Sequence, residues 1–70
     1  MKIRANGDEQ EITSAMTIRQ YLDGYLLQKG LDITLVSVEL NFRIPPREQW
    51  DTIRLEDGDN LEIIRFIGGG

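Results

Sequence analysis

Apolar and polar residues alternate at the start of the chain, which is the two-residue period of a half-buried β-strand. The apolar side of this first segment consists of Met1, Ile3 and Ala5. The Asn-Gly pair at residues 6–7 predicts a tight hairpin, because both residues tolerate the positive φ angles that such a turn requires. Residues 9–13 are then expected to form a short return strand that carries Ile12.

The apolar period changes to three and four residues between positions 17 and 30, which predicts an amphipathic helix. Thr17 and Gln20 have the spacing of a capping box, in which each side chain binds a backbone N–H at the helix start. Gly30 suits the left-handed conformation that ends a helix, whereas the pattern gives no reason for Gly24 inside it. The apolar stripe consists of Ile18, Tyr21, Leu22, Tyr25 and Leu26.

Two more strands are predicted in the second half of the chain. Residues 33–40 are rich in β-branched side chains, and either Leu35 or Val36 begins their buried set. Residues 60–67 alternate again and form the last strand.

The segment between these two strands is irregular. The proline pair at residues 45–46 ends any strand ladder, because proline has no N–H to donate. Residues 47–50 are expected to form a single helical turn that brings Trp50 to the edge of the core. Residues 56–59, with the sequence EDGD, are typical of a turn.

The order of elements is strand, strand, helix, strand, short strand, strand, which predicts an α+β fold of the β-grasp, ubiquitin-like type. We expect a mixed sheet of four to five strands with one main helix packed on one face. Residues 1–67 would form this domain, and residues 68–70 a flexible glycine tail. The predicted core includes Ile3, Leu22, Leu26, Val38, Leu61 and Ile63.

Alternation along the last strand turns Ile64 and Phe66 away from the helix. If that sheet face is open, the two side chains form an exposed apolar patch, and such patches commonly mark binding surfaces. The alternative is that neighbouring side chains such as Arg4 cover them. We favour the exposed patch and predict that Ile64 and Phe66 bind a partner.

Composition removes most catalytic chemistry from consideration. The chain has no cysteine and no histidine, so it lacks zinc–thiolate ligands and the commonest general base. Its two serines, Ser14 and Ser37, have no imidazole to activate them. We therefore expect no catalytic residue, no metal site and no bound cofactor.

Charge and hydropathy exclude two further classes of partner. A net charge of −4 argues against nucleic-acid binding, which requires a clustered basic face. The apolar runs are too short to span a membrane, and the first residues lack the core of a signal peptide. A cytoplasmic location is the default expectation.

Two other features have plain structural interpretations. The acidic residues of segment 54–62 lack the regular ligand spacing of a calcium loop, so we interpret them as a solvated turn. Trp50 could offer a stacking surface for a base or a sugar. We favour a core position, because aromatic residues supply much of the area that a small core buries.

The chain ends on three glycines directly after the last strand. Residues without side chains form a thin thread that ends in a carboxylate, and such a thread can enter a narrow active-site tunnel. Ordering it costs roughly 1–2 kcal/mol per residue, so its binding would be reversible and driven by contacts elsewhere. The terminus therefore has the character of a substrate for another enzyme.

These features together resemble the ThiS sulfur carriers of thiamin biosynthesis, relatives of ubiquitin and of the small subunit of molybdopterin synthase. The resemblance covers essentially the whole chain and rests on the segments TIRQYL, VELN, PREQW, DGD and EIIRFIGGG. The glycine end and DGD are shared with the molybdopterin relatives, whereas PREQW and the short length favour ThiS. A terminal diglycine is sufficient in this family, so Gly68 is an additional glycine.

The resemblance implies a protein co-substrate rather than an enzyme. An adenylating enzyme related to ubiquitin-activating enzymes (ThiF-like) would use ATP to activate the carboxylate of Gly70. Sulfur would then replace AMP to give a thiocarboxylate, which passes to thiazole synthase (ThiG-like). Gly68 and Gly69 would thread into the partner, and Ile64 and Phe66 would dock it.

Two alternatives to this function remain open. The same thiocarboxylate chemistry could serve molybdopterin synthesis or tRNA thiolation. The chain could also be a non-covalent ubiquitin-like binding module whose tail is never activated.

Overall fold

The computed structural model describes residues 1–12 and 15–66, and its sheet begins with the predicted hairpin. Strand β1 (Lys2–Ala5) pairs antiparallel with β2 (Asp8–Glu11). The turn between them uses positive φ angles of 50° at Asn6 and 86° at Gly7. Asn and Gly are the residues that adopt this conformation most readily, which explains the tight connection.

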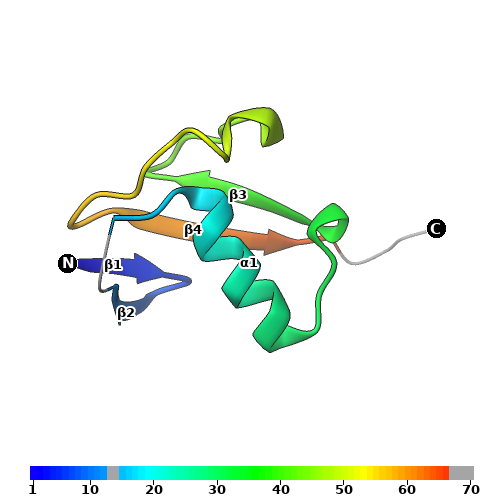
Figure 1. The fold of residues 1–70 in the computed structure, drawn as a ribbon, viewed down its shortest axis with the longest axis horizontal. Helices are drawn as coiled ribbons and strands as arrows, with labels where there is room; N and C mark the ends of the chain where they lie inside the picture. Colours follow the sequence, from blue (N-terminus) through cyan, green and yellow to red (C-terminus); the bar gives the residue numbers. More distant parts are fainter. Residues whose placement is uncertain (13–14, 67–70) are drawn as a thin grey trace.

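The last strand lies in the middle of the sheet. Strand β4 (Asn60–Arg65) runs parallel to β1 and antiparallel to β3 (Val36–Leu40), so the strand order is β2-β1-β4-β3. Helix α1 (Ile18–Lys29) crosses one face of this sheet (Figure 1). This arrangement confirms the predicted β-grasp fold, with four strands in the described part of the chain. Apart from these strand pairs, isolated bridges join Thr17 to Arg54 and Leu40 to Arg43 in the described residues.

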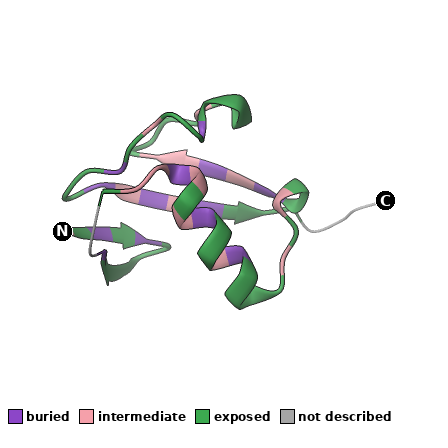
Figure 2. Cartoon of the chain, viewed as in Figure 1, coloured by how far each residue is buried: buried purple, intermediate pink, exposed green. Residues whose placement is uncertain are grey.

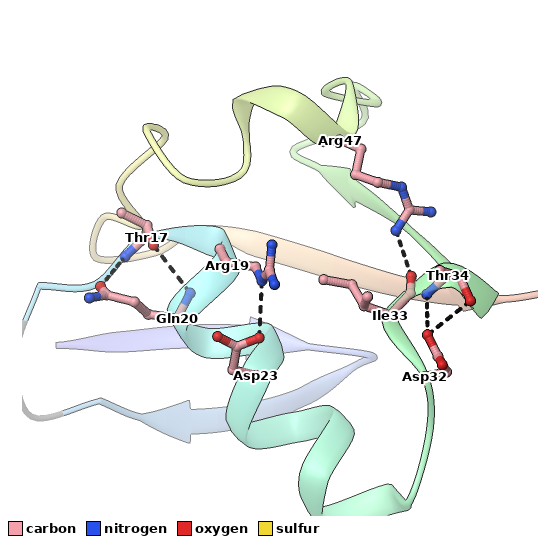
Figure 3. Close-up of polar contacts among 8 residues, drawn as sticks. All are labelled: Thr17, Arg19, Gln20, Asp23, Asp32, Ile33, Thr34 and Arg47. Atoms are coloured by element: carbon pink, nitrogen blue, oxygen red, sulfur yellow. Dashed lines mark hydrogen bonds and ion pairs between the residues drawn. The ribbon is translucent and has the colours of Figure 1, made fainter.

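Both ends of α1 have the predicted caps. The Thr17 hydroxyl accepts from the Gln20 N–H at 3.1 Å, and the Gln20 side chain accepts from the Thr17 N–H at 2.9 Å (Figure 3). Gly30 ends the helix with a φ of 68°, and an ion pair of 3.0 Å joins Arg19 to Asp23 along its exposed side. In the residues described, no helix combines the length and apolar character needed to cross a membrane.

The core lies between α1 and the sheet, where buried residues of the helix face those of β3 and β4 (Figure 2). All six residues predicted to be in the core are buried, with exposed fractions from 0% to 9%. The same cluster also contains five further buried residues, Ile12, Ile18, Val36, Trp50 and Leu55. The apolar period of three and four residues in the helix and of two residues in the strands therefore predicted the buried faces correctly.

The predicted strand at residues 33–40 begins later than expected. Ile33–Leu35 form a short 3-10 helix, η1, and the strand begins at Val36. The Asp32 carboxylate explains the difference, because it accepts from both the backbone N–H and the hydroxyl of Thr34 at 2.9 Å and so caps η1 (Figure 3). The backbone hydrogen bond, followed by the hydroxyl, lowers the pKa of Asp32.

We predict that Leu26→Ala costs about 2–5 kcal/mol of unfolding free energy, because it leaves a cavity in the core. The neighbouring Leu27→Ala is the matched control, since Leu26 is 5% exposed and Leu27 is 85% exposed. The control should change stability by less than about 0.5 kcal/mol. Urea unfolding of the two variants checks this, and equal losses would contradict the assignment of the helix face.

Candidate functional site

Three exposed apolar side chains gather where β4 ends. Leu35, Ile64 and Phe66 are 45%, 41% and 54% exposed, and we call them the β4-end patch. Ile64 lies opposite Ser37 in the β3–β4 ladder, and the Phe66 N–H donates to the Leu35 carbonyl at 2.8 Å. The start of β3 and the end of β4, which are far apart in the sequence, are thus held side by side.

The predicted exposure of Ile64 and Phe66 agrees with the structure, and the alternative cover by Arg4 does not. Arg4 lies opposite Asn60, at the other end of β4. Ile64 is four positions further along the strand than Asn60, which is roughly 13 Å at the usual rise per residue. Of the two residues that could begin the buried set of segment 33–40, Val36 is confirmed, because it is fully buried. Leu35 lies in η1 and is exposed.

The glycine tail follows this patch directly in the sequence. Phe66 is the last described residue, and the predicted site residues Gly68, Gly69 and Gly70 lie outside the described residues. Phe66 follows the end of β4, so the described part of the chain stops at the same end of the sheet as the patch (Figure 1).

Arg47 fixes the backbone beneath the patch, a role that the sequence pattern did not suggest. Its guanidinium donates to the carbonyl of Ile33 at 2.6 Å (Figure 3). It also donates to the carbonyl of Val36 at 2.9 Å. These two carbonyls bracket Leu35, whose own carbonyl accepts from Phe66. Arg47 begins the 3-10 turn η2 (Arg47–Gln49), the single helical turn predicted for this segment.

Trp50 anchors Arg47 from the core side. The guanidinium lies 4.8 Å from the centre of the Trp50 ring, a cation–π distance. Trp50 is 2% exposed, and its indole N–H donates to the Pro45 carbonyl at 3.2 Å. The predicted core position is therefore correct, and Trp50 offers no free stacking face. The spacing of Arg47 and Trp50 within PREQW is the sequence signal that could have suggested their contact.

The acidic turn before β4 differs from the prediction at one residue. Asp59 is only 9% exposed and accepts from the Glu56 N–H at 2.7 Å and from the Asn41 side chain at 2.9 Å. It is therefore a structural acceptor rather than part of a solvated turn. Among the described residues, 1–12 and 15–66, no group of three His, Cys, Asp or Glu residues is placed to hold a metal ion.

The ThiS family profile matches residues 3–70 of this chain. The chain belongs to the ThiS family. A crystal structure of the thiamine biosynthesis protein ThiS from Geobacter metallireducens superposes on this ThiS-family chain with a TM-score of 0.81 at 29% identity, covering 100% of both chains. A solution structure of a thiamine biosynthesis protein from the same organism gives a TM-score of 0.72 at 27% identity, covering all of this chain and 88% of that one.

Two curated relatives are much longer than this ThiS-family chain. It is 39% identical to a thiazole synthase from Paramagnetospirillum magneticum and 33% identical to one from Magnetococcus marinus, in each case over all 70 residues. These 70 residues cover 20% of each relative, so the chain spans about a fifth of the length of these proteins. In both, a segment similar to this chain belongs to the same polypeptide as a much larger remainder.

We predict that Arg47→Lys destabilises the protein by about 1–2 kcal/mol, because lysine lacks the planar fork that serves two carbonyls at once. Arg43→Lys is the matched control, since no side-chain hydrogen bond or ion pair of Arg43 occurs among the described residues. Urea unfolding measures the loss, and amide exchange at Phe66 should accelerate only in the Arg47 variant. Equal stability of the two variants would show that the Arg47 contacts contribute nothing.

Proposed function

We propose that this chain is a sulfur carrier of thiamin biosynthesis, with the carboxylate of Gly70 as its reacting group. The observation that carries the proposal is the exposed β4-end patch, which precedes a glycine ending by a few residues in a ThiS-family fold. A thread of glycines contributes little affinity by itself. Recognition must therefore come from the folded surface beside it, and the patch supplies that surface.

The proposed chemistry begins with a carboxylate, which is a poor electrophile. An adenylating partner joins the carboxylate oxygen of Gly70 to the α-phosphate of ATP, and pyrophosphate leaves. The outer sulfur of a persulfide then attacks the acyl carbon, and AMP leaves with the former carboxylate oxygen. The chain is now joined to the sulfur donor by an S–S bond. A thiol attacks the donor's sulfur, forms a disulfide with the donor and releases the chain as a thiocarboxylate.

The carrier contributes accessibility and orientation in this scheme. Gly68 and Gly69 have no side chains to obstruct a narrow tunnel, and the contacts of Arg47 hold the patch in one arrangement before a partner arrives. Such preorganisation reduces the entropy lost on binding. The proposed consumer of the sulfur is a thiazole synthase, a partner supported by the similarity to two proteins of that name.

Incubation with ATP, a sulfur donor and the adenylating partner tests the function directly. The intact chain should gain the mass of one oxygen-to-sulfur exchange at its C-terminus. A chain that binds the partner and never gains this mass would instead be a non-covalent ubiquitin-like module.

We predict that deleting Gly70, or adding one residue after it, abolishes adenylation and leaves the melting temperature unchanged. The reacting carboxylate is then displaced along the tunnel, whereas the folded core is untouched. ATP–pyrophosphate exchange measures adenylation, with Leu27→Ala as a control that retains the wild-type rate. Normal exchange by the extended chain would disprove the requirement for a terminal Gly70.

We further predict that Phe66→Ala weakens binding to the adenylating enzyme by roughly 30-fold or more, as loss of an aromatic interface anchor does. The domain should stay folded, because Phe66 is 54% exposed. Titration calorimetry beside a melting curve measures both quantities, and Leu27→Ala serves as the exposed apolar control. Unchanged affinity removes Phe66 from the interface, and a large fall in melting temperature gives it a structural role.

A further inference from the structure

Two carboxylates face each other beside the β4-end patch. Glu39 of β3 lies directly opposite Glu62 of β4 in the antiparallel ladder, and both residues are half-buried. The next pair on the same face, nearer the end of β4, is Ser37 with Ile64. Because Ile64 belongs to the β4-end patch, the acidic pair and the apolar patch form one continuous surface.

Alternation along the two strands places this pair on the sheet face away from the helix. Val38 and Ile63, which precede Glu39 and follow Glu62, are both buried in the core beneath α1. Successive side chains of a strand point to opposite faces, so the two glutamates point away from α1. The helix crosses the opposite face, where the core lies (Figure 1). The acidic pair is therefore accessible from the same side as Ile64.

The pair is unfavourable for the fold by itself. Like charges that lie directly opposite each other across a ladder are destabilising. Over residues 1–12 and 15–66, no cation lies within ion-pair distance of either carboxylate. Arg4, the cation that the neighbouring strand β1 presents beside β4, aligns with Asn60 rather than with Glu62. The two negative charges are thus available to a cation from outside the domain.

The geometry of the pair indicates which cation fits. Directly opposite residues of an antiparallel pair have Cβ atoms roughly 4.5–5.5 Å apart, so one group between them can reach both carboxylates. A guanidinium suits this position, because its planar fork of N–H donors binds carboxylates in fixed directions. The net charge of −4 adds long-range attraction toward a basic surface. The surface therefore fits a partner that presents an arginine beside apolar side chains.

The position of the pair limits which partner uses it. Glu62 is four positions before Phe66, roughly 13 Å along the strand at the usual rise per residue. A standard protein interface buries about 800 Å² on each partner, a region roughly 30 Å across, so one partner covers both residues. The glycines follow Phe66 closely in the sequence. An enzyme that receives Gly70 and contacts the β4-end patch is thus also within reach of the acidic pair.

We propose that the adenylating enzyme inserts an arginine between Glu39 and Glu62 when it docks on the β4-end patch. This inference rests on the proposed function and adds the residues that select the partner. Ile64 and Phe66 supply the apolar contact area, whereas the two carboxylates determine which surface is accepted. Charge complementarity of this kind contributes specificity and fast association, and it relieves the repulsion within the pair.

The substitutions Glu39→Gln and Glu62→Gln test the proposal, because glutamine keeps the length of the side chain and removes its charge. The melting temperature should stay constant or rise, since the repulsion between like charges is lost. Affinity for the adenylating enzyme of the source organism, measured by titration calorimetry, should fall by about tenfold in each variant. Added salt should weaken the binding of the wild-type chain more than that of either variant.

Glu9→Gln is the matched control. Glu9 is an exposed glutamate of β2, which β1 separates from β4, and its substitution changes the net charge by the same amount. This variant should bind the adenylating enzyme with wild-type affinity. An equal loss of affinity in Glu9→Gln would show that the net charge alone acts, and it would overturn the role of the pair.

The remaining outcomes separate this inference from the proposed function. Wild-type affinity in both Glu39→Gln and Glu62→Gln overturns the inference, and so does a fall in melting temperature that accounts for the lost affinity. The proposed function still stands in either case if the wild-type chain gains its sulfur. A wild-type chain that binds the adenylating enzyme and never gains sulfur overturns the proposed function instead. The affinities of the variants then still decide whether the acidic pair is used.

Discussion

The pairing of β4 with a neighbour on each side determines where the β4-end patch lies. Five residue pairs join β4 to β3, and β1 aligns beside it in parallel. Because the last strand is central, the described part of the chain ends in the middle of the sheet rather than at an edge strand. The β4-end patch and the two-residue turn at Asn41 and Phe42 lie at opposite ends of the paired strands β3 and β4.

Arg47 and Trp50 connect the core to the backbone beside the β4-end patch. Trp50 fills the core and carries the Arg47 guanidinium on its ring, and the guanidinium holds two carbonyls at the junction of η1 and β3. A small domain buries only about 60% of its unfolded surface, so a precise surface requires individual polar contacts of this kind. Within the PREQW segment, Trp50 therefore packs in the core and Arg47 fixes the backbone of the candidate site.

One helix on one face leaves the other face of the sheet to solvent. The exposed apolar residues of this domain are therefore concentrated at strand ends and turns, beside Phe66 and Phe42. Neither group contributes to folding in proportion to its apolar area, and Phe42 also carries an unfavourable φ angle. The proposed carrier function requires such surfaces, because each partner enzyme must recognise the carrier and release it.

The sequence by itself determined the capped helix, the Asn-Gly hairpin, the six predicted core residues and the outward direction of Ile64 and Phe66. Those features depend on periodicity and on side chains within a few positions of one another, so local order encodes them. The glycine ending and PREQW also carried the family resemblance. The start of β3 was predicted too early, because a single local cap at Asp32 outweighed the strand preference of the β-branched residues that follow.

Only the tertiary structure decided the roles of Arg47, Asp59 and Phe42. Arg47 reaches carbonyls 11 and 14 residues away, and Asn41 meets Asp59 across 18 residues. Contacts at these separations follow from which strands pair, and local patterns do not encode that choice. Leu40 and Arg43 close the turn that contains Phe42, and Asn41 binds this turn to Asn60 and Asp59, two partners distant in sequence that no local pattern indicates.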